Sequence, residues 1–203
     1  MTTTIYFIRH GQTKWNLEKR LQGHMDSPLT KNGELQAKNL SNHLKCLQFD
    51  TIYSSSSPRA MSTAKIISKE KAEIIQLDEL REINMGFWEG KEIKQIQASY
   101  VDSYKQFFEE PHLYLPINGG ETFIDLLKRM VSILEEIIST HEGKTILIVS
   151  HRFSLKTILN YYSGNALKEL KYMPDIPPAS LSKVTINKRY PSVELYGDTS
   201  HYD

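Results

Sequence analysis

The sequence predicts an α/β fold, a three-layer sandwich with a mostly parallel central sheet and helices on both of its faces. Two observations predict it. Short β-branched or aromatic segments alternate with longer amphipathic segments along the 203 residues, and this alternation is typical of parallel strands joined by helices. In addition, residues 144–150 (KTILIVS) are apolar nearly throughout, as expected of a strand that is buried on both faces.

The first part of the chain alternates three predicted strands with two predicted helices. β-Branched and aromatic residues predict strands at residues 3–9, 49–55 and 72–77. A helix is predicted at residues 30–48, with Thr30 as its N-cap. A second helix is predicted at residues 57–71, with Ser57 as N-cap and Pro58 at the first helical position, where a missing N–H does no harm.

The last part of the chain repeats this pattern. Apolar residues at three- and four-residue spacing predict a long helix at residues 121–143. The buried strand 144–150 follows, and then a helix at residues 153–164. Two further alternating segments, residues 181–188 and 192–197, predict a closing hairpin or edge strands.

The length suits one domain spanning residues 1–203. One region interrupts the alternation, because residues 84–121 are rich in aromatic and turn residues. Its aromatic side chains include Trp88, Tyr100, Tyr104, Phe107, Phe108 and Tyr114. We interpret residues 84–121 as a cap-like helical insertion over an edge of the sheet.

Composition excludes several classes of function. The formal net charge is +1, so the chain has no overall basic field that would attract nucleic acid or an anionic membrane. Cys46 is the only cysteine, so an intrachain disulfide or a cysteine metal cluster is excluded. We expect Cys46 to be a small buried side chain. The first residues lack the pattern of a signal peptide, and no apolar run approaches the ~20 residues of a membrane span. We therefore expect a cytoplasmic protein without a membrane partner.

Charged side chains follow three of the predicted strands. Arg9 and His10 end the first strand, Arg59 follows the serine run after the second, and His151 and Arg152 follow strand 144–150. Open parallel sheets bind ligands at the carboxyl ends of their strands. We therefore expect two imidazoles and at least two guanidiniums to converge at one place.

A tetrahedral dianion such as a phosphoryl group fits this set best, because arginine forks match phosphate oxygens. A divalent metal fits poorly, since neighbouring guanidiniums repel it and no carboxylate follows these strands. A serine hydrolase is the rival, with Ser150 or Ser54 to Ser57 available, but IVSHR is not a G-x-S-x-G elbow. Helices that begin near Pro58 and after His151 are expected to add N–H donors for the anion.

His10 is placed to attack such a phosphoryl group while Arg9 binds it. Neutral imidazole is a competent nucleophile near pH 7, because its unperturbed pKa is about 6.5. The phosphoramidate formed is itself reactive, so one difficult displacement becomes two easier ones. Gly11 is expected to let the chain turn sharply after His10 and to leave room for the phosphate.

An ordered set of motifs covers nearly the whole chain: RHGQTKWN (9–16), RLQGHMDSPLTKNG (20–33), SSSSPRAMSTA (54–64), LREINMGFWEG (80–90), GGET (119–122) and VSH (149–151). With these motifs the sequence resembles the histidine phosphatase superfamily, the phosphoglycerate-mutase-like fold class, and within it the phosphatase branch. The resemblance implies that His10 is the phosphorylated nucleophile and Glu82 the proton donor. It implies a phosphate pocket of Arg9, Arg59 and His151 with Asn16 as a further donor, and an approach of Gln22 and Gly23 to the substrate. The family usually has glycine where this chain has Arg152, which is expected either to point outward or to add a positive charge at the mouth of the site.

Three functional hypotheses follow. The first is a metal-independent phosphomonoesterase without a cofactor, acting on a small phosphorylated substrate, with the insertion over its active site. The second is a cofactor-dependent phosphoglycerate mutase, which would return the phosphoryl group to a hydroxyl of the substrate. Against it, the segment between the LRE motif and the closing motifs is shorter than is usual in family mutases. The third is a non-catalytic module that binds a phosphorylated ligand.

Overall fold

The computed structural model describes residues 1–69, 72–116 and 119–202 and has a six-stranded sheet at its centre, in the order β3-β2-β4-β1-β5-β6. The strands are β1 (Thr2–Arg9), β2 (Thr51–Ser55), β3 (Ile74–Leu77), β4 (Thr145–Ser150), β5 (Leu181–Asn187) and β6 (Tyr190–Asp198). The first four are parallel to one another, and β5 and β6 form an antiparallel hairpin at the edge beside β1. The mostly parallel sheet and the closing hairpin are as predicted.

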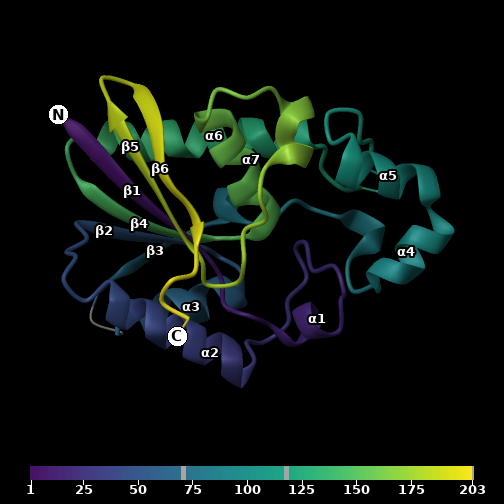
Figure 1. Ribbon diagram of the computed structural model, residues 1–203, viewed down its shortest axis with the longest axis horizontal. Helices are drawn as coiled ribbons and strands as arrows, with labels where there is room; N and C mark the ends of the chain where they lie inside the picture. Colours follow the sequence, from purple (N-terminus) through teal and green to yellow (C-terminus); the bar gives the residue numbers. More distant parts are fainter. Residues whose placement is uncertain (70–71, 117–118, 203) are drawn as a thin grey trace.

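Helices cover both faces of this sheet (Figure 1). The longer helices are α2 (Lys31–His43), α3 (Pro58–Ser68), α6 (Phe123–Thr140) and α7 (Arg152–Tyr162). Because strand side chains alternate between faces, Ile146 and Ile148 of β4 belong to the apolar cluster that includes α6 and α7, whereas Leu147 and Val149 belong to the cluster that includes α2 and α3. The predicted three-layer sandwich is confirmed.

Helix ends depart from the prediction in instructive ways. Thr30 caps α2 as expected, since its side chain accepts a hydrogen bond from the N–H of Gly33, but α2 ends at His43 rather than at residue 48. Cys46 consequently lies beyond the helix and is exposed, so the prediction of a buried cysteine is wrong. Ser57 occupies the N-cap position of α3 without a side-chain capping bond. Residues 70 and 71 of the predicted helix lie outside the described residues.

The aromatic-rich region carries two helices, α4 (Ile93–Ser99) and α5 (Val101–Glu109), which stand beside the layered part of the molecule (Figure 1). Phe107 of α5 is buried, and its ring lies 5.0 Å from the ring of Phe123 in α6 and 5.0 Å from that of Phe153 in α7. These centroid distances are typical of favourable aromatic pairs. The region is therefore packed onto the same two helices that cover the sheet.

The remaining short elements lie in the connections. They are the four-residue helix α1 (Lys14–Leu17) and the 3-10 helices Asp78–Leu80, Gly86–Trp88 and Leu167–Tyr172. Within the described part of the chain, no helix combines the length and apolar character that crossing a membrane requires.

The pairing of β1 with β4 determines where the chemistry gathers. Arg9 is in register with Ser150, and the N–H of His10 donates to the carbonyl of Ser150 at 3.0 Å. The residues that follow the two strands are therefore neighbours, and the rings of His10 and His151 lie edge to face with centroids 5.2 Å apart.

Candidate active site

A pocket of about 320 Å³ opens at the carboxyl ends of the parallel strands. The predicted site residues that line it are Arg9, His10, Asn16, Gln22, Gly23, Arg59, Glu82 and Arg152. His151 does not line the pocket but packs behind His10. The structure thus brings together the end of β1 and residues that follow β1, β2, β3 and β4 in the chain.

His10 is buried, and its ring is fixed by one main-chain contact. Nδ1 lies 2.8 Å from the carbonyl oxygen of Gly11. Because a carbonyl oxygen only accepts hydrogen bonds, Nδ1 carries the ring proton and the lone pair is on Nε2. Burial, and then the charges of Arg59 and Arg9, lower the pKa of His10 well below its usual range. The ring is therefore neutral at pH 7, with one nitrogen available for attack.

His151 is also fully buried, and its Nε2 lies 2.8 Å from Oγ of Ser55 at the end of β2. Burial, followed by the charges of Arg59, His10 and Arg9, lowers its pKa well below the usual value. Nδ1 has no hydrogen-bond partner among the described residues. Ser55 is thus the side chain that orients His151.

The two buried arginines are held through main-chain carbonyls. Nη1 of Arg9 donates to the carbonyl of Ile176 at 2.6 Å, while Nη1 and Nη2 of Arg59 donate to the carbonyls of Met25 (2.7 Å) and Gly23 (2.8 Å). In both residues Nε is without a partner in the described part of the chain. Each guanidinium is therefore anchored at one end and keeps donors for an anion.

Burial lowers the pKa of both guanidiniums. The pKa of Arg9 falls to about 10, through burial first and then through the charge of Arg152. For Arg59 burial is also the main cause, and Asp26 opposes it because its carboxylate lies 3.0 Å from Nη1. Both arginines remain charged at neutral pH, so buried side chains concentrate positive charge at the pocket.

Glu82 is buried at the N-terminus of α7. Its Oε1 accepts hydrogen bonds from the N–H groups of Ile83 and Ser154 and from the Ser154 hydroxyl, at 3.0 to 3.1 Å. Among the described residues, its Oε2 accepts only from the N–H of Phe153, at 3.1 Å. Oε2 is therefore the oxygen with room to exchange a proton with a ligand.

This contact corrects one expectation. We predicted that the helix after His151 would present its first N–H groups to the bound anion, yet the N–H groups of Phe153 and Ser154 bind Glu82. At the start of α3 the N–H of Arg59 likewise lies 3.3 Å from Oδ1 of Asp26. Carboxylates of the chain itself occupy these helix termini, as expected from the positive end of the helix dipole.

The loop at residues 16–25 forms one wall of the pocket. Oδ1 of Asn16 accepts from the N–H and hydroxyl of Thr13, so its amide nitrogen is the end left for a ligand. Gly23 has φ +52°, and a Cβ there would lie 2.2 Å from Oε1 of Glu89. The Glu89 carboxylate accepts from the N–H groups of His24 and Met25 at 2.8 and 2.9 Å. Only glycine at position 23 permits this close contact.

The structure also shows what surrounds Gly11 and Arg152. Gly11 is required for a reason other than a sharp turn, because a Cβ there would lie 2.5 Å from the carbonyl oxygen of Gly33 in the first turn of α2. Arg152 lines the pocket, but its Nε donates to Oδ1 of Asp175 at 2.6 Å. Its positive charge is therefore present at the wall and already paired.

Comparison with known proteins places this geometry in a family. The family model of the histidine phosphatase superfamily (branch 1) matches residues 5–199. The chain belongs to the histidine phosphatase superfamily. It is 32% identical to phosphoserine phosphatase 1 of Hydrogenobacter thermophilus over 76% of this chain and 73% of that protein. It is 33% identical to a probable phosphoglycerate mutase of Escherichia fergusonii over 98% of this chain and 94% of that protein.

Among solved structures, the chain is similar to YhfR of Bacillus stearothermophilus. The TM-score is 0.95 and the identity 37%, with 99% of this chain and all of that chain covered. These relatives support a phosphoryl-transfer enzyme of the histidine phosphatase superfamily and include both phosphatase-like and mutase-like proteins.

Proposed function

We propose that the chain is a phosphomonoesterase that hydrolyses a small phosphorylated metabolite through a phosphohistidine on His10, without a metal or a cofactor. The observation that carries the proposal is a neutral His10 whose Nε2 is free, in a pocket that also holds two buried guanidiniums and Glu82. Cationic side chains here supply the charge stabilisation that a metal supplies elsewhere.

In the first step, Nε2 of His10 attacks phosphorus in line and the bond to the ester oxygen breaks. Arg9 and Arg59 stabilise the equatorial oxygens, over which charge is spread. His151, which packs behind His10 with its Nε2 held by Ser55, supports the ring of the nucleophile. Glu82, protonated at Oε2, gives its proton to the departing alkoxide.

In the second step, the Glu82 carboxylate takes a proton from water as the water attacks phosphohistidine. Inorganic phosphate leaves, and both His10 and Glu82 return to their starting protonation states, so the cycle is balanced. The same phosphohistidine would serve a mutase if a substrate hydroxyl replaced water. The likeness to a probable mutase over nearly the whole chain keeps that alternative as the second candidate.

We further infer a single-domain enzyme of the cytoplasm, with residues 84–121 as a cap-like insertion that contributes Met85 and Ile93 to the pocket. Asn16, Gln22, Gly23 and Arg152 would contact the substrate. A net charge of +1 supports a small phosphorylated substrate rather than nucleic acid or a membrane.

The test uses labelled phosphomonoester, rapid quench and excess EDTA. We expect turnover to survive chelation and an acid-labile, base-stable label to appear on His10. His10→Ala should lose at least ~10³ of the rate, the scale for removal of a covalent nucleophile, whereas the exposed His112→Asn should not. Label on serine, or a metal requirement, would refute the mechanism. Transfer of label to an added hydroxy acid faster than to water would favour the mutase.

A further inference from the structure

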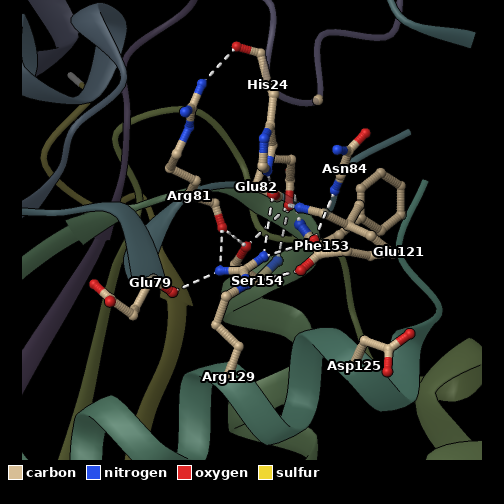
Figure 2. Close-up of polar contacts among 12 residues, drawn as sticks. His24, Glu79, Arg81, Glu82, Asn84, Glu121, Asp125, Arg129, Phe153 and Ser154 are labelled. Atoms are coloured by element: carbon tan, nitrogen blue, oxygen red, sulfur yellow. Dashed lines mark hydrogen bonds and ion pairs between the residues drawn. The ribbon is translucent and has the colours of Figure 1, made fainter. Parts of the chain in front are cut away.

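Arg129 of α6 and Glu121, just before that helix, form a two-point ion pair next to the segment that carries Glu82 (Figure 2). Nε of Arg129 lies 2.8 Å from Oε1 of Glu121, and Nη2 lies 2.8 Å from Oε2. The two side chains are only 19% and 21% exposed. A fork-to-fork pair in this setting has a fixed geometry, unlike a pair at the open surface.

The remaining donors of Arg129 bind the main chain of residues 79–82. Nη1 donates to the carbonyls of Glu79 at 2.5 Å and Arg81 at 3.0 Å, and Nη2 reaches the carbonyl of Glu82 at 3.3 Å (Figure 2). One planar guanidinium therefore fixes three carbonyl oxygens and one carboxylate at the same time. A lysine ammonium is a point charge and lacks the planar fork that reaches all of these acceptors.

Glu121 connects the same pair to the base of the aromatic insertion. Its Oε2 accepts from the N–H of Asn84 at 2.8 Å, and its own N–H donates to the carbonyl of Asn84 at 2.8 Å. Burial, the largest single influence, would raise the pKa of Glu121, but the hydrogen bonds from Arg129 and from the N–H of Asn84, together with the charge of Arg129, outweigh it and the net shift is downward. Glu121 is thus ionised at neutral pH. Two hydrogen bonds hold Asn84 and Glu121 together close to Glu82.

From these contacts we infer that Arg129 and Glu121 are positioning residues for Glu82. The inference rests on the proposed role of Glu82 as proton donor and names the groups that hold it. The N-terminus of α7 fixes the Glu82 carboxylate, while Arg129, together with Nε2 of His24 at 3.0 Å, fixes its carbonyl. Losing Arg129 frees one end of the residue, so the carboxylate shifts relative to the leaving oxygen.

The decisive variant is Arg129→Lys, which keeps the charge and removes the fork. We expect kcat/KM for glycerol phosphate, an alkyl ester whose leaving group needs a proton, to fall by about 10²-fold, the cost of a 1 Å misplacement. For nitrophenyl phosphate, whose leaving group needs little protonation, kcat/KM should fall less than about threefold. Glu121→Gln should show the same contrast, because it breaks the pair from the other side.

A double-mutant cycle separates positioning from general structural damage. In a Glu82→Gln background the proton donor is already absent, so adding Arg129→Lys should change kcat/KM for glycerol phosphate by less than about threefold. Full additivity of the two losses would overturn the inference. So would equal losses on both substrates, or unchanged kinetics of Arg129→Lys.

Two controls calibrate the cycle. Ile137→Val shortens a buried side chain of α6, and should lower Tm without changing the ratio of the two substrates. Lys183→Gln removes an ion pair of 2.6 Å on β5, and should change neither kcat/KM. If Glu82→Gln itself fails to discriminate the two substrates, the proposed function fails; if it discriminates and Arg129→Lys does not, only the positioning role fails.

Discussion

At the scale of single residues, Arg152 shows how a charge at the pocket wall depends on a partner far away in the chain. Its guanidinium donates to Asp175, whose Oδ1 also accepts from the N–H of Ile176 at 2.8 Å. Burial would raise the pKa of Asp175, but the hydrogen bond and charge of Arg152, together with the N–H of Ile176 and the charge of Arg9, outweigh it and lower the pKa. Asp175 is therefore an anion that offsets Arg152 within the pocket.

Asp175→Asn should release this charge. We expect the KM for a phosphomonoester with an added carboxylate to fall about 1.4- to 5-fold, since a partly exposed ion pair contributes about 0.2–1 kcal/mol. Asparagine still accepts a hydrogen bond from Ile176, so the segment that anchors Arg9 stays in place. Steady-state kinetics on paired substrates with and without the carboxylate measure the effect.

The matched control is the double variant Asp175→Asn with Arg152→Gly. In this double variant the KM for the substrate with the added carboxylate should return to the wild-type value. The kinetics with nitrophenyl phosphate should be unchanged in both the single and the double variant. A lower KM that persists without Arg152 would show that the released charge is not responsible. A fall in kcat for nitrophenyl phosphate would instead indicate that Asp175 supports Arg9 through Ile176.

The sequence predicts which residues gather at the site more readily than it predicts which side chains hold them in position. Arg9, His10 and His151 follow directly from strand ends, because parallel strands deliver their next residues to one edge. Asp26, Ser55 and Arg129 could not be predicted, since their partners lie 33, 96 and up to 50 residues away. Nothing in the local pattern distinguishes Asp26 from a solvated carboxylate.

At the scale of elements, local periodicity predicts the strands and the longer helices, but not where those helices end or what their ends bind. α2 stops at His43 although leucines continue beyond it. α1 spans only four residues, too short for a periodic signal, and is held by reciprocal bonds between Thr13 and Asn16. The N–H groups of Phe153 and Ser154 at the start of α7 donate to the side chain of Glu82 and are not left for a bound ligand. The local pattern of α7 could not predict this, because Glu82 lies about 70 residues earlier in the chain.

The insertion depends on one aromatic side chain. The ring of Phe107 lies 4.9 to 5.7 Å from those of Trp88, Tyr114, Phe123 and Phe153. Phe107→Ala should lower the free energy of unfolding by about 3–5 kcal/mol, the usual cost of deleting a buried phenylalanine. It should also lower kcat, because Phe153 donates its N–H to Glu82.

Denaturant unfolding and kinetics at a permissive temperature separate the two effects. Phe87→Ala is the matched control, because Phe87 belongs to the same region but is 45% exposed, and surface substitutions usually change stability by less than about 0.5 kcal/mol. A loss from Phe107→Ala no larger than that from Phe87→Ala would contradict the assigned packing role.

At the scale of the whole molecule, burying two histidines beside cationic groups makes stability depend on pH. His10 and His151 are 3% and 0% exposed and neutral in the folded chain. Their neighbours Arg59 and Arg9 repel any added proton, and burial penalises the imidazolium. In the unfolded chain both rings regain a pKa of about 6.5.

The direction of the pH effect follows from proton counts. Below about pH 6.5 the unfolded chain binds protons that the folded chain refuses, so the free energy of unfolding must fall as pH falls. Each of the two histidines adds a slope of up to about 1.4 kcal/mol per pH unit between about pH 6.5 and 5, before most carboxylates begin to titrate. Urea unfolding at closely spaced pH values should show this steep decline.

Variants assign the slope to its source. His151→Asn removes one group that binds a proton only in the unfolded chain. It should therefore reduce the slope of the free energy of unfolding against pH, between about pH 6.5 and 5, by up to about 1.4 kcal/mol per pH unit, whatever its effect on the stability at pH 8. The exposed His112→Asn should leave the slope unchanged. Inorganic phosphate adds a counter-charge among the arginines and binds only the folded chain, so it should raise stability across the range. A free energy of unfolding that stays flat from pH 7 to 5 would mean that His10 and His151 accept protons in the folded state, and a nucleophile kept neutral by its surroundings would have to be abandoned.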